Sequence, residues 1–294
     1  MFRIAHISDL HLAPLPRVST RRLMSKRILG FLSWQRKRRF DHLQRVLDAL
    51  EDDLAASAPD HLCITGDLTN ITLPGEVDNA TAWLEAQGDP HKISLIPGNH
   101  DSYVKGSLDY ALERWARWMR DDDGRMGFPY LHRRGPVDIV GLSSAVASLP
   151  ALSGGRLGAD QIDRCETLLQ AREDANRPAL LLVHHPPHDG ACTQRRALWD
   201  RAAFQDMLKR VGGVKAVLFG HLHSPVRARL EGRDGPIAVL GAGAASAVGK
   251  KKAPAHYHLI DIEGDAADTM AITLRHRHYD PRRGSFAGGE EQAL

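Results

Sequence analysis

Five short blocks of Asp, Asn and His recur along the chain, and each follows an apolar run that is typical of a β-strand. In chain order, the blocks are Asp9-Leu10-His11, Gly66-Asp67, Gly98-Asn99-His100-Asp101, His184-His185-Pro186-Pro187 and Gly220-His221-Leu222-His223. In sheets that alternate strands with helices, the loops at strand ends carry the chemistry. We therefore expect the five blocks to form one polar site at one edge of a sheet.

The residue types in these blocks are ligands for divalent cations. Imidazole suits Zn, Fe, Mn or Ni, and carboxylate with amide suits Mn or Fe, so the mixed set does not select one metal. Cys is absent from all five blocks, which argues against a purely structural zinc site. A lone buried His or Asp is more often structural than a ligand, but five blocks in series favour a two-metal site. Such sites hydrolyse phosphate esters.

The composition excludes several classes of protein. Of the 294 residues, 43% are apolar and 26% are charged, as in an ordinary globular protein. No apolar run reaches the roughly 18 residues of a membrane span, and the first residues lack the pattern of a signal peptide. The three cysteines are too few and too far apart for a disulfide scaffold. These features predict a cytoplasmic protein, with contact at the inner membrane face left open.

The hydrophobic pattern predicts strands that alternate with helices. Helical spacing of apolar residues covers 40–57, 77–87, 107–120, 159–173 and 199–211. Short apolar runs predict strands over 2–8, 61–65, 92–96, 137–142, 179–183 and 214–219. After residue 226 strands and turns follow one another, which suggests a second stacked sheet. We expect one α/β domain over 1–280 and a loose polar tail over 281–294.

The order and content of the five blocks resemble the calcineurin-like metallophosphoesterase superfamily, over roughly residues 3–223. Within it, the Gly-Asn-His-Asp and His-His-Pro-Pro forms are similar to those of bacterial cyclic-nucleotide and glycerophosphodiester phosphodiesterases. The resemblance implies a four-layer αββα sandwich of two mixed β-sheets flanked by helices. It also implies two divalent or mixed-valence metal ions, drawn from Mn, Fe and Zn.

The family pattern implies a ligand role for residues in every block. Asp67 would bridge the two cations, and a hydroxide between them would attack phosphorus. The implied ligands fall into two sets that share Asp67: Asp9, His11 and His223 for one metal, and Asn99, His184 and His221 for the other.

Three further residues lie next to these ligands in the sequence. His100 is expected to contact the phosphate or to protonate the leaving oxygen, and the alternative is a histidine held in place by Asp101. Asp101 is expected to orient His100 or a ligand. His185 could replace His184 as the ligand, but the family pattern and a strand that ends at Val183 favour His184.

A basic and apolar segment follows the first block, and we treat residues 15–39 as an insertion at the mouth of the site. Between residues 10 and 40 there are nine Lys or Arg residues and no Asp or Glu, interleaved with Leu, Met, Ile, Phe and Trp. Four interpretations stay open: a lid that steers anionic substrates, a peripheral membrane contact through 17–39, a nucleic-acid contact, and a helical hairpin packed on the domain or a neighbouring subunit.

Four further histidines lie in the C-terminal strands. His256 and His258 alternate along one predicted strand, and His276 and His278 alternate along the next. We expect these side chains to be solvated rather than to bind another metal.

The predicted function is a metal-dependent phosphodiesterase acting on a small or lipid-linked phosphodiester, such as a cyclic nucleotide or a glycerophosphodiester. The alternatives are a UDP-acylglucosamine-type pyrophosphatase at the membrane surface, a DNA nuclease, and a non-enzymatic scaffold. Outside the basic segment 30 basic residues face 36 acidic ones, which disfavours a nuclease and nucleic-acid partners. A scaffold should lack at least one ligand, and all seven are present.

Overall fold

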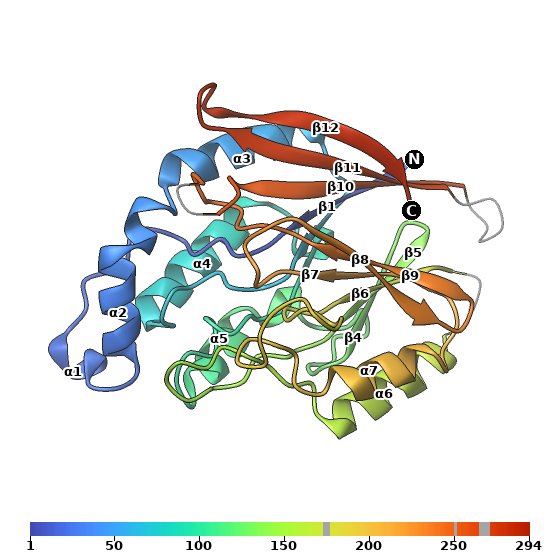
Figure 1. Ribbon diagram of the computed structural model, residues 1–294, viewed down its shortest axis with the longest axis horizontal. Helices are drawn as coiled ribbons and strands as arrows, with labels where there is room; N and C mark the ends of the chain where they lie inside the picture. Colours follow the sequence, from blue (N-terminus) through green and yellow to red (C-terminus); the bar gives the residue numbers. More distant parts are fainter. Residues whose placement is uncertain (173–176, 250–251, 265–270) are drawn as a thin grey trace.

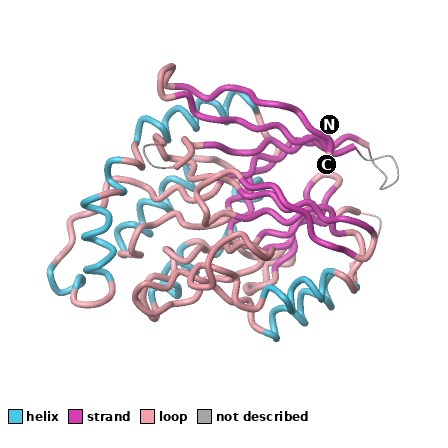
Figure 2. The backbone as a smooth tube through the Cα atoms, in the orientation of Figure 1, coloured by secondary structure: helices cyan, strands magenta, loops and turns pink. Residues whose placement is uncertain are grey.

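The computed structural model describes residues 1–172, 177–249, 252–264 and 271–294. Within these residues, two mixed six-stranded sheets lie face to face (Figure 1; Figure 2). The first sheet has the order β12 (Ser285–Ala293), β11 (Ala271–Asp280), β10 (His256–Glu263), β1 (Phe2–Ile7), β2 (His61–Ile64) and β3 (Ile93–Leu95). The second sheet has the order β4 (Tyr130–Arg134), β5 (Val137–Gly141), β6 (Ala179–Leu182), β7 (Val214–Phe219), β9 (Gly235–Gly241) and β8 (Val226–Gly232).

Helices cover the outer faces of both sheets and complete the predicted αββα sandwich. The α-helices are α1 (Thr20–Leu23), α2 (Arg27–Arg36), α3 (Gln44–Ser57), α4 (Pro74–Ala86), α5 (Ser107–Arg114), α6 (Ala159–Gln170) and α7 (Arg201–Leu208). Short 3₁₀ helices are η1 (Arg38–Phe40), η2 (Pro90–Lys92) and η3 (Ala116–Trp118). Apolar residues at helical spacing decide which face of each helix is buried: in α3 these are Val46, Leu47, Leu50 and Leu54.

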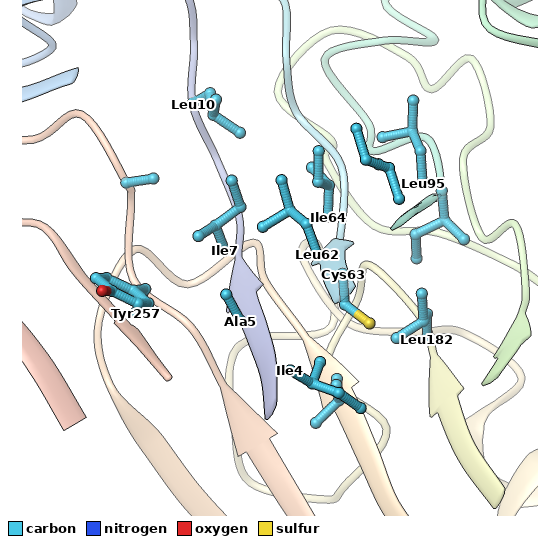
Figure 3. Close-up of a cluster of buried hydrophobic side chains, with 14 of the residues drawn as sticks. Ile4, Ala5, Ile7, Leu10, Leu62, Cys63, Ile64, Leu95, Leu182 and Tyr257 are labelled. Atoms are coloured by element: carbon cyan, nitrogen blue, oxygen red, sulfur yellow. The ribbon is translucent and has the colours of Figure 1, made fainter. Parts of the chain in front are cut away.

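Alternate residues of the central strands face two different cores. On β6, Leu180 and Leu182 belong to the core between the sheets, whereas Leu181 belongs to the core beneath α6 and α7. Figure 3 shows Leu182 and Cys63 within the core between the sheets. Because side chains alternate along a strand, a strand that is apolar on both faces must be covered on both sides.

Parallel pairing brings the carboxyl ends of the central strands to the same edge. β1, β2 and β3 are parallel to one another, as are β5, β6, β7 and β9. Asp9, Asp67, Asn99, His184 and His221 each follow the end of one of these strands by a few residues. The topology therefore gathers the five sequence blocks before any side-chain contact is considered.

The C-terminal residues correct one expectation. Instead of a loose tail over 281–294, β12 pairs antiparallel with β11. Phe286 is 8% exposed and packs against the rings of Tyr257 and Tyr279. Most side chains of this edge strand are exposed, so its composition is polar and resembles that of a tail.

The basic insertion forms α1 and α2 at the side of the body (Figure 1). The Arg27 side chain donates to Ile71 O at 2.9 Å, and Lys26 Nζ donates to Ser148 O at 2.9 Å. Gly30 is buried, and a Cβ there would overlap the side chains of Ile71 and Tyr103. The hairpin thus packs on loops that follow the central strands. In the described part of the chain, no helix combines the length and the apolar character that crossing a membrane requires.

Candidate metal centre

One group of donor atoms gathers where β1, β2 and β7 end. The ligand atoms of Asp9, His11, Asp67 and His223 all lie within 4.8 Å of one another. Asp9 Oδ1 is 3.1 Å from His223 Nε2, and the Nε2 atoms of His11 and His223 are 3.3 Å apart. These four side chains could hold one divalent cation with oxygen and nitrogen donors.

A second group lies beside the first. His184 Nε2 is 3.2 Å from Asn99 Oδ1, and His221 Nδ1 is 2.8 Å from the same oxygen. Asp67 Oδ2 is 3.4 Å from His184 Nε2 and 3.8 Å from His11 Nε2. A single carboxylate oxygen therefore faces both groups, which is the position that a ligand shared by two cations requires.

Unpaired buried atoms show that these groups fit metal ions. Asp9 Oδ1 and Asp67 Oδ2 are buried, and neither has a hydrogen-bond partner among the described residues. An unpaired buried carboxylate oxygen is costly unless a cation compensates it. His11 Nδ1 donates to Thr69 O at 2.9 Å and His184 Nδ1 donates to Thr65 O at 2.6 Å, so the Nε2 atoms of both rings face the site. Metal-binding histidines commonly make this second contact.

The electrostatics of the site also favour a cation. Burial opposes a charge on His184, but the Asp67 carboxylate raises the pKa of His184 to about 9. Burial likewise opposes the charge on Asp67, but His184 lowers the pKa of Asp67 well below its usual range. A site that binds a proton this strongly also attracts a metal cation.

Backbone strain is concentrated in the same loops. In the described part of the chain, eight residues other than glycine have a positive φ, and five of them are predicted ligands. They are Asp9 (φ 52), His11 (φ 43), Asp67 (φ 58), His221 (φ 68) and His223 (φ 54). Such conformations are unfavourable for residues with a Cβ and persist where the surroundings enforce them, often at functional sites. A Cβ on nearby Gly98 would overlap the Asp67 carboxylate, so glycine is required there.

Asp101 orients the loop that carries Asp67. Its Oδ2 accepts the main-chain N–H groups of Asp67 at 2.8 Å and Gly98 at 2.9 Å, and its Oδ1 accepts that of Thr69 at 3.0 Å. Burial, and then the Asp67 charge, raise the pKa of Asp101 to about 7. These contacts agree with orientation of a ligand, one of the two roles expected for Asp101.

His100 lies at the mouth of the site, where an arginine of the insertion covers it. His100 Nδ1 donates to Asn70 O at 2.6 Å, and Nε2 accepts from Arg38 Nη2 at 2.6 Å. Burial, and then the Arg38 charge, lower the pKa of His100 to about 3. In this arrangement His100 is neutral, and the positive charge beside it belongs to Arg38.

Sequence reasoning missed two residues of the site, Arg38 and His42. The His42 ring centroid lies 4.8 Å from that of His11 and 5.7 Å from that of His223. His42 is 3% exposed, with its Nδ1 2.8 Å from Ser246 Oγ. One sequence signal could have identified them: both residues lie at the end of a basic segment that begins next to a ligand block.

The two neighbouring histidines of the fourth block differ in their free nitrogens. His185 Nε2 donates to Ser153 O at 3.0 Å, and its Nδ1 lies 2.8 Å from Ser144 Oγ, which can donate to it. Both ring nitrogens of His185 are therefore engaged, whereas His184 Nε2 faces Asp67. This difference supports His184 as the ligand.

The histidines of β10 are not solvated, contrary to expectation. His256 is 4% exposed and His258 is fully buried, and both rings lie near His276 of β11. Gly243 N–H donates to His256 Nδ1 at 2.7 Å. A neutral imidazole that accepts a hydrogen bond at Nδ1 carries its proton on Nε2, so neither nitrogen has a free lone pair for a cation. We therefore do not assign a further metal site to this cluster.

A pocket of about 560 Å³ opens onto the metal centre. Its lining combines Asp67, Asn99, His100, His221 and His223 with residues of the basic insertion. The other described residues that add charge or an aromatic ring to its lining are Arg36, Lys37, Arg38, Phe40, Asp41, His42, Arg196 and Lys252. The pocket is therefore predominantly cationic outside the metal centre.

Comparison with known proteins agrees with this geometry. A probable cyclic nucleotide phosphodiesterase of Synechococcus sp. is 29% identical over 278 residues, covering 90% of this chain and 89% of that protein. A 3′,5′-cyclic-nucleotide phosphodiesterase of Nostoc sp. is 27% identical over 228 residues, covering 76% of this chain and 72% of that protein.

The fold is also found among solved structures. A dimetal phosphatase from Danio rerio superposes with a TM-score of 0.65 at 14% identity, covering 100% of this chain and 98% of that one. The sequence profile of the calcineurin-like phosphoesterases matches residues 2–225, which include all five blocks. The chain therefore belongs to the calcineurin-like phosphoesterase family and is a phosphoric ester hydrolase.

Proposed function

We propose that the protein is a phosphodiesterase that uses two metal ions to hydrolyse a small phosphodiester. The observation that carries the proposal is the position of Asp67 Oδ2 between His11 Nε2 and His184 Nε2. In this proposal one cation is held by Asp9, His11, Asp67 and His223, and the other by Asp67, Asn99, His184 and His221.

In this proposal the metal ions and the side chains around them have different roles in the reaction. When bound, the two cations supply Lewis acidity toward the phosphoryl oxygens and the attacking water. Arg38 and His100 lie at the mouth, where the leaving group of a bound diester would lie. The His100 ring is held by its Nδ1–H to Asn70 O, and once substrate displaces Arg38 its Nε2 is free to take a proton from solvent and pass it to the leaving oxygen.

The relatives support a diester rather than a monoester as the substrate. Both are named as cyclic nucleotide phosphodiesterases, and one covers most of this chain. A cyclic nucleotide or a glycerophosphodiester is our first candidate class. The pocket, at about 560 Å³, is large enough for either.

Hydrolysis of bis-p-nitrophenyl phosphate by protein loaded with Mn²⁺ tests the proposal. We expect turnover that a chelator abolishes and that added Mn²⁺ restores, together with about two metal ions per chain by elemental analysis. Absence of turnover with Mn²⁺, Fe²⁺ and Zn²⁺ alike would contradict the proposal. Slow hydrolysis of p-nitrophenyl phosphate under the same conditions would confirm the preference for diesters.

A lipid-linked phosphodiester is the second candidate, favoured by exposed apolar residues on the insertion. Met24 is 84% exposed, Ile28 48%, Leu29 53% and Leu32 38%. They lie among the nine basic residues of this segment, a combination typical of helices that lie on anionic membranes. Phe40, 45% exposed, continues this surface to the pocket that it also lines.

Co-sedimentation with vesicles separates the two candidates. If the substrate is lipid-linked, wild type should bind vesicles that contain phosphatidylglycerol and not vesicles of phosphatidylcholine alone. The variant Ile28→Ser with Leu29→Ser should lose this binding, whereas Met126→Ser, which removes an apolar residue that is 46% exposed elsewhere, should keep it. Failure of wild type to sediment with either kind of vesicle would remove the membrane from the proposal and leave the small diester. Equal binding by all three proteins would exclude Ile28 and Leu29 as the contact.

A further inference from the structure

Three cations converge on the pocket from separate parts of the chain. Arg38 comes from η1 and donates to His100 at 2.6 Å. Arg196 precedes α7, and its Nη2 donates to His221 O at 3.1 Å. Lys252 follows β9, and its Nζ donates to Leu222 O at 2.8 Å. Arg38, Arg196 and Lys252, which we call the cation cluster, are each tied to a residue in or beside the metal centre.

The cation cluster forms no ion pair with a carboxylate in the described part of the chain. Among the described residues, no ion pair within 4.0 Å involves any of its three members. The carboxylates that line the pocket in the described chain are Asp41 and Asp67, and Asp67 belongs to the metal centre. Arg36 and Lys37 add two further positive charges to the lining.

The members of the cluster act on one another. Burial lowers the pKa of Lys252, and the Arg196 and Arg38 charges lower it further, against the opposing effect of the Asp9 and Asp41 carboxylates. Burial is also the main cause that lowers the pKa of Arg38. Like charges held together without direct ion-pair partners destabilise the fold, and such arrangements are concentrated where a ligand of opposite charge binds. The cluster therefore has the character of an anion site rather than of a structural ion-pair network.

A simple phosphodiester does not account for this much positive charge. Its phosphoryl group carries one negative charge, which the metal centre of the proposed function would already compensate. Guanidinium groups donate in a fork that matches phosphate oxygens, and an ammonium adds a point charge. The cluster thus has the donors for a second phosphoryl group, bound at the same time as the scissile one.

We propose that Arg38, Arg196 and Lys252 form an anion subsite that binds a second phosphate of the substrate, next to the scissile phosphodiester at the metal centre. The substrate class is then a phosphodiester that carries a further phosphate group, rather than a diester with a single charge. This inference rests on the proposed function, because it takes the metal centre as the place of cleavage.

Calorimetric titration of Mn²⁺-loaded protein with two matched ligands tests the subsite. Adenosine 5′-monophosphate offers one phosphate, and adenosine 3′,5′-bisphosphate adds a second to the same nucleoside. We expect the bisphosphate to bind wild type at least about tenfold more tightly, as charge-assisted hydrogen bonds to one more phosphate would give. In Arg196→Gln and Lys252→Gln this advantage should fall to about threefold or less.

Controls separate a subsite from a structural role. Lys215→Gln removes an exposed cation on β7 that does not line the pocket, and it should keep the full advantage of the bisphosphate. Arg196→Lys and Lys252→Arg retain the positive charge and should keep part of the affinity advantage of the bisphosphate. Metal content and thermal unfolding identify any variant that has lost its fold. If a Gln variant has lost its fold, the Lys or Arg variant at the same position is compared with wild type instead.

The outcomes also distinguish this inference from the proposed function. Equal affinity of wild type for both ligands, or an advantage that survives in both Gln variants, would overturn the subsite. Turnover of bis-p-nitrophenyl phosphate together with equal affinities would leave the phosphodiesterase standing without a subsite. A bisphosphate advantage that depends on the cluster, in a protein that hydrolyses no diester, would support the subsite and reject the proposed function.

Discussion

The Asp101 carboxylate holds the main chain of Asp67, with 2.8 Å between Asp101 Oδ2 and the Asp67 nitrogen. Asp67 Oδ1 in turn accepts the main-chain N–H of His100 at 2.7 Å. These bonds lock the loop after β2 to the loop after β3 and leave Asp67 Oδ2 directed at the two donor groups. The geometry of the metal centre thus depends on a residue that offers it no ligand atom.

Asp101→Asn should destabilise the fold and weaken metal binding together. An amide presents N–H where the carboxylate now accepts N–H groups, so at least one of these donors loses its partner. We expect a loss of about 2–4 kcal/mol in the free energy of unfolding, measured with urea, and a lower metal content. The control Asp89→Asn alters an exposed carboxylate that accepts one main-chain N–H, from His91, and should cost less than about 1 kcal/mol. Similar losses in both variants would contradict this role for Asp101.

Asp67→Ala should abolish metal binding and turnover at once. Its Oδ2 faces both donor groups, so its removal leaves two like charges without a shared ligand. Elemental analysis and turnover of bis-p-nitrophenyl phosphate provide the two measurements. Asp78→Ala, which removes an exposed carboxylate beside Tyr110, should change neither. Full metal content in Asp67→Ala would rule out the shared-ligand role.

His100→Ala should spare metal binding and slow the reaction. The imidazole is not among the proposed ligands, but it lies beside them, with its ring centroid 4.9 Å from that of His11. We expect kcat to fall by roughly two to four decades at unchanged metal content. His91→Ala, on the exposed η2, serves as the control. Unchanged kinetics in His100→Ala would reject a catalytic role.

His132 should make the stability of the protein sensitive to acid. Its Nε2 donates to Arg120 O at 2.5 Å, and its Nδ1 lies 2.7 Å from Ser94 Oγ. Burial, with a contribution from Arg134, lowers the pKa of His132 from 6.5 to about 4. Between pH 6.5 and 4, His132 therefore binds a proton in the unfolded state but not in the folded state. The stabilisation is complete above pH 6.5 and is lost as the pH falls toward 4.

Urea unfolding at a series of pH values measures this contribution. Between pH 6.5 and 4, the free energy of unfolding of wild type should fall by about 3 kcal/mol more than that of His132→Gln, which has no imidazole to protonate. Other buried histidines titrate in both proteins and cancel in the difference. Parallel curves for the two proteins would exclude His132 as a source of acid sensitivity.

Phe286→Ala should show that the C-terminal strand belongs to the fold. Phe286 is the buried contact between β12 and the rings of Tyr257 and Tyr279. We expect a loss of about 3 kcal/mol in the free energy of unfolding, the lower end of the range for a buried Phe. Ser285→Ala, at the adjacent exposed position, should have no measurable effect. A loose tail would give the same result for both variants.

Local sequence patterns predicted much of the secondary structure. Apolar spacing in the sequence anticipated α3 and α6 to within a few residues at their ends, and the short apolar runs anticipated β2 and β6. β4 was missed, because His132 and Arg134 interrupt its apolar pattern, and β12 was missed because its side chains are mostly exposed. Such strands are defined by their partners rather than by their own residues.

By itself, the sequence determined which side chains are candidate donors and placed them at strand ends. Each block is a short motif, and the apolar run before it is a local pattern that predicts a strand. Only the tertiary structure decided that Arg38 covers His100, that His42 lies beside His11, and that His258 is buried rather than solvated. These contacts join residues distant in the chain. Their energy comes from burial and charge in a shared environment that no single segment specifies.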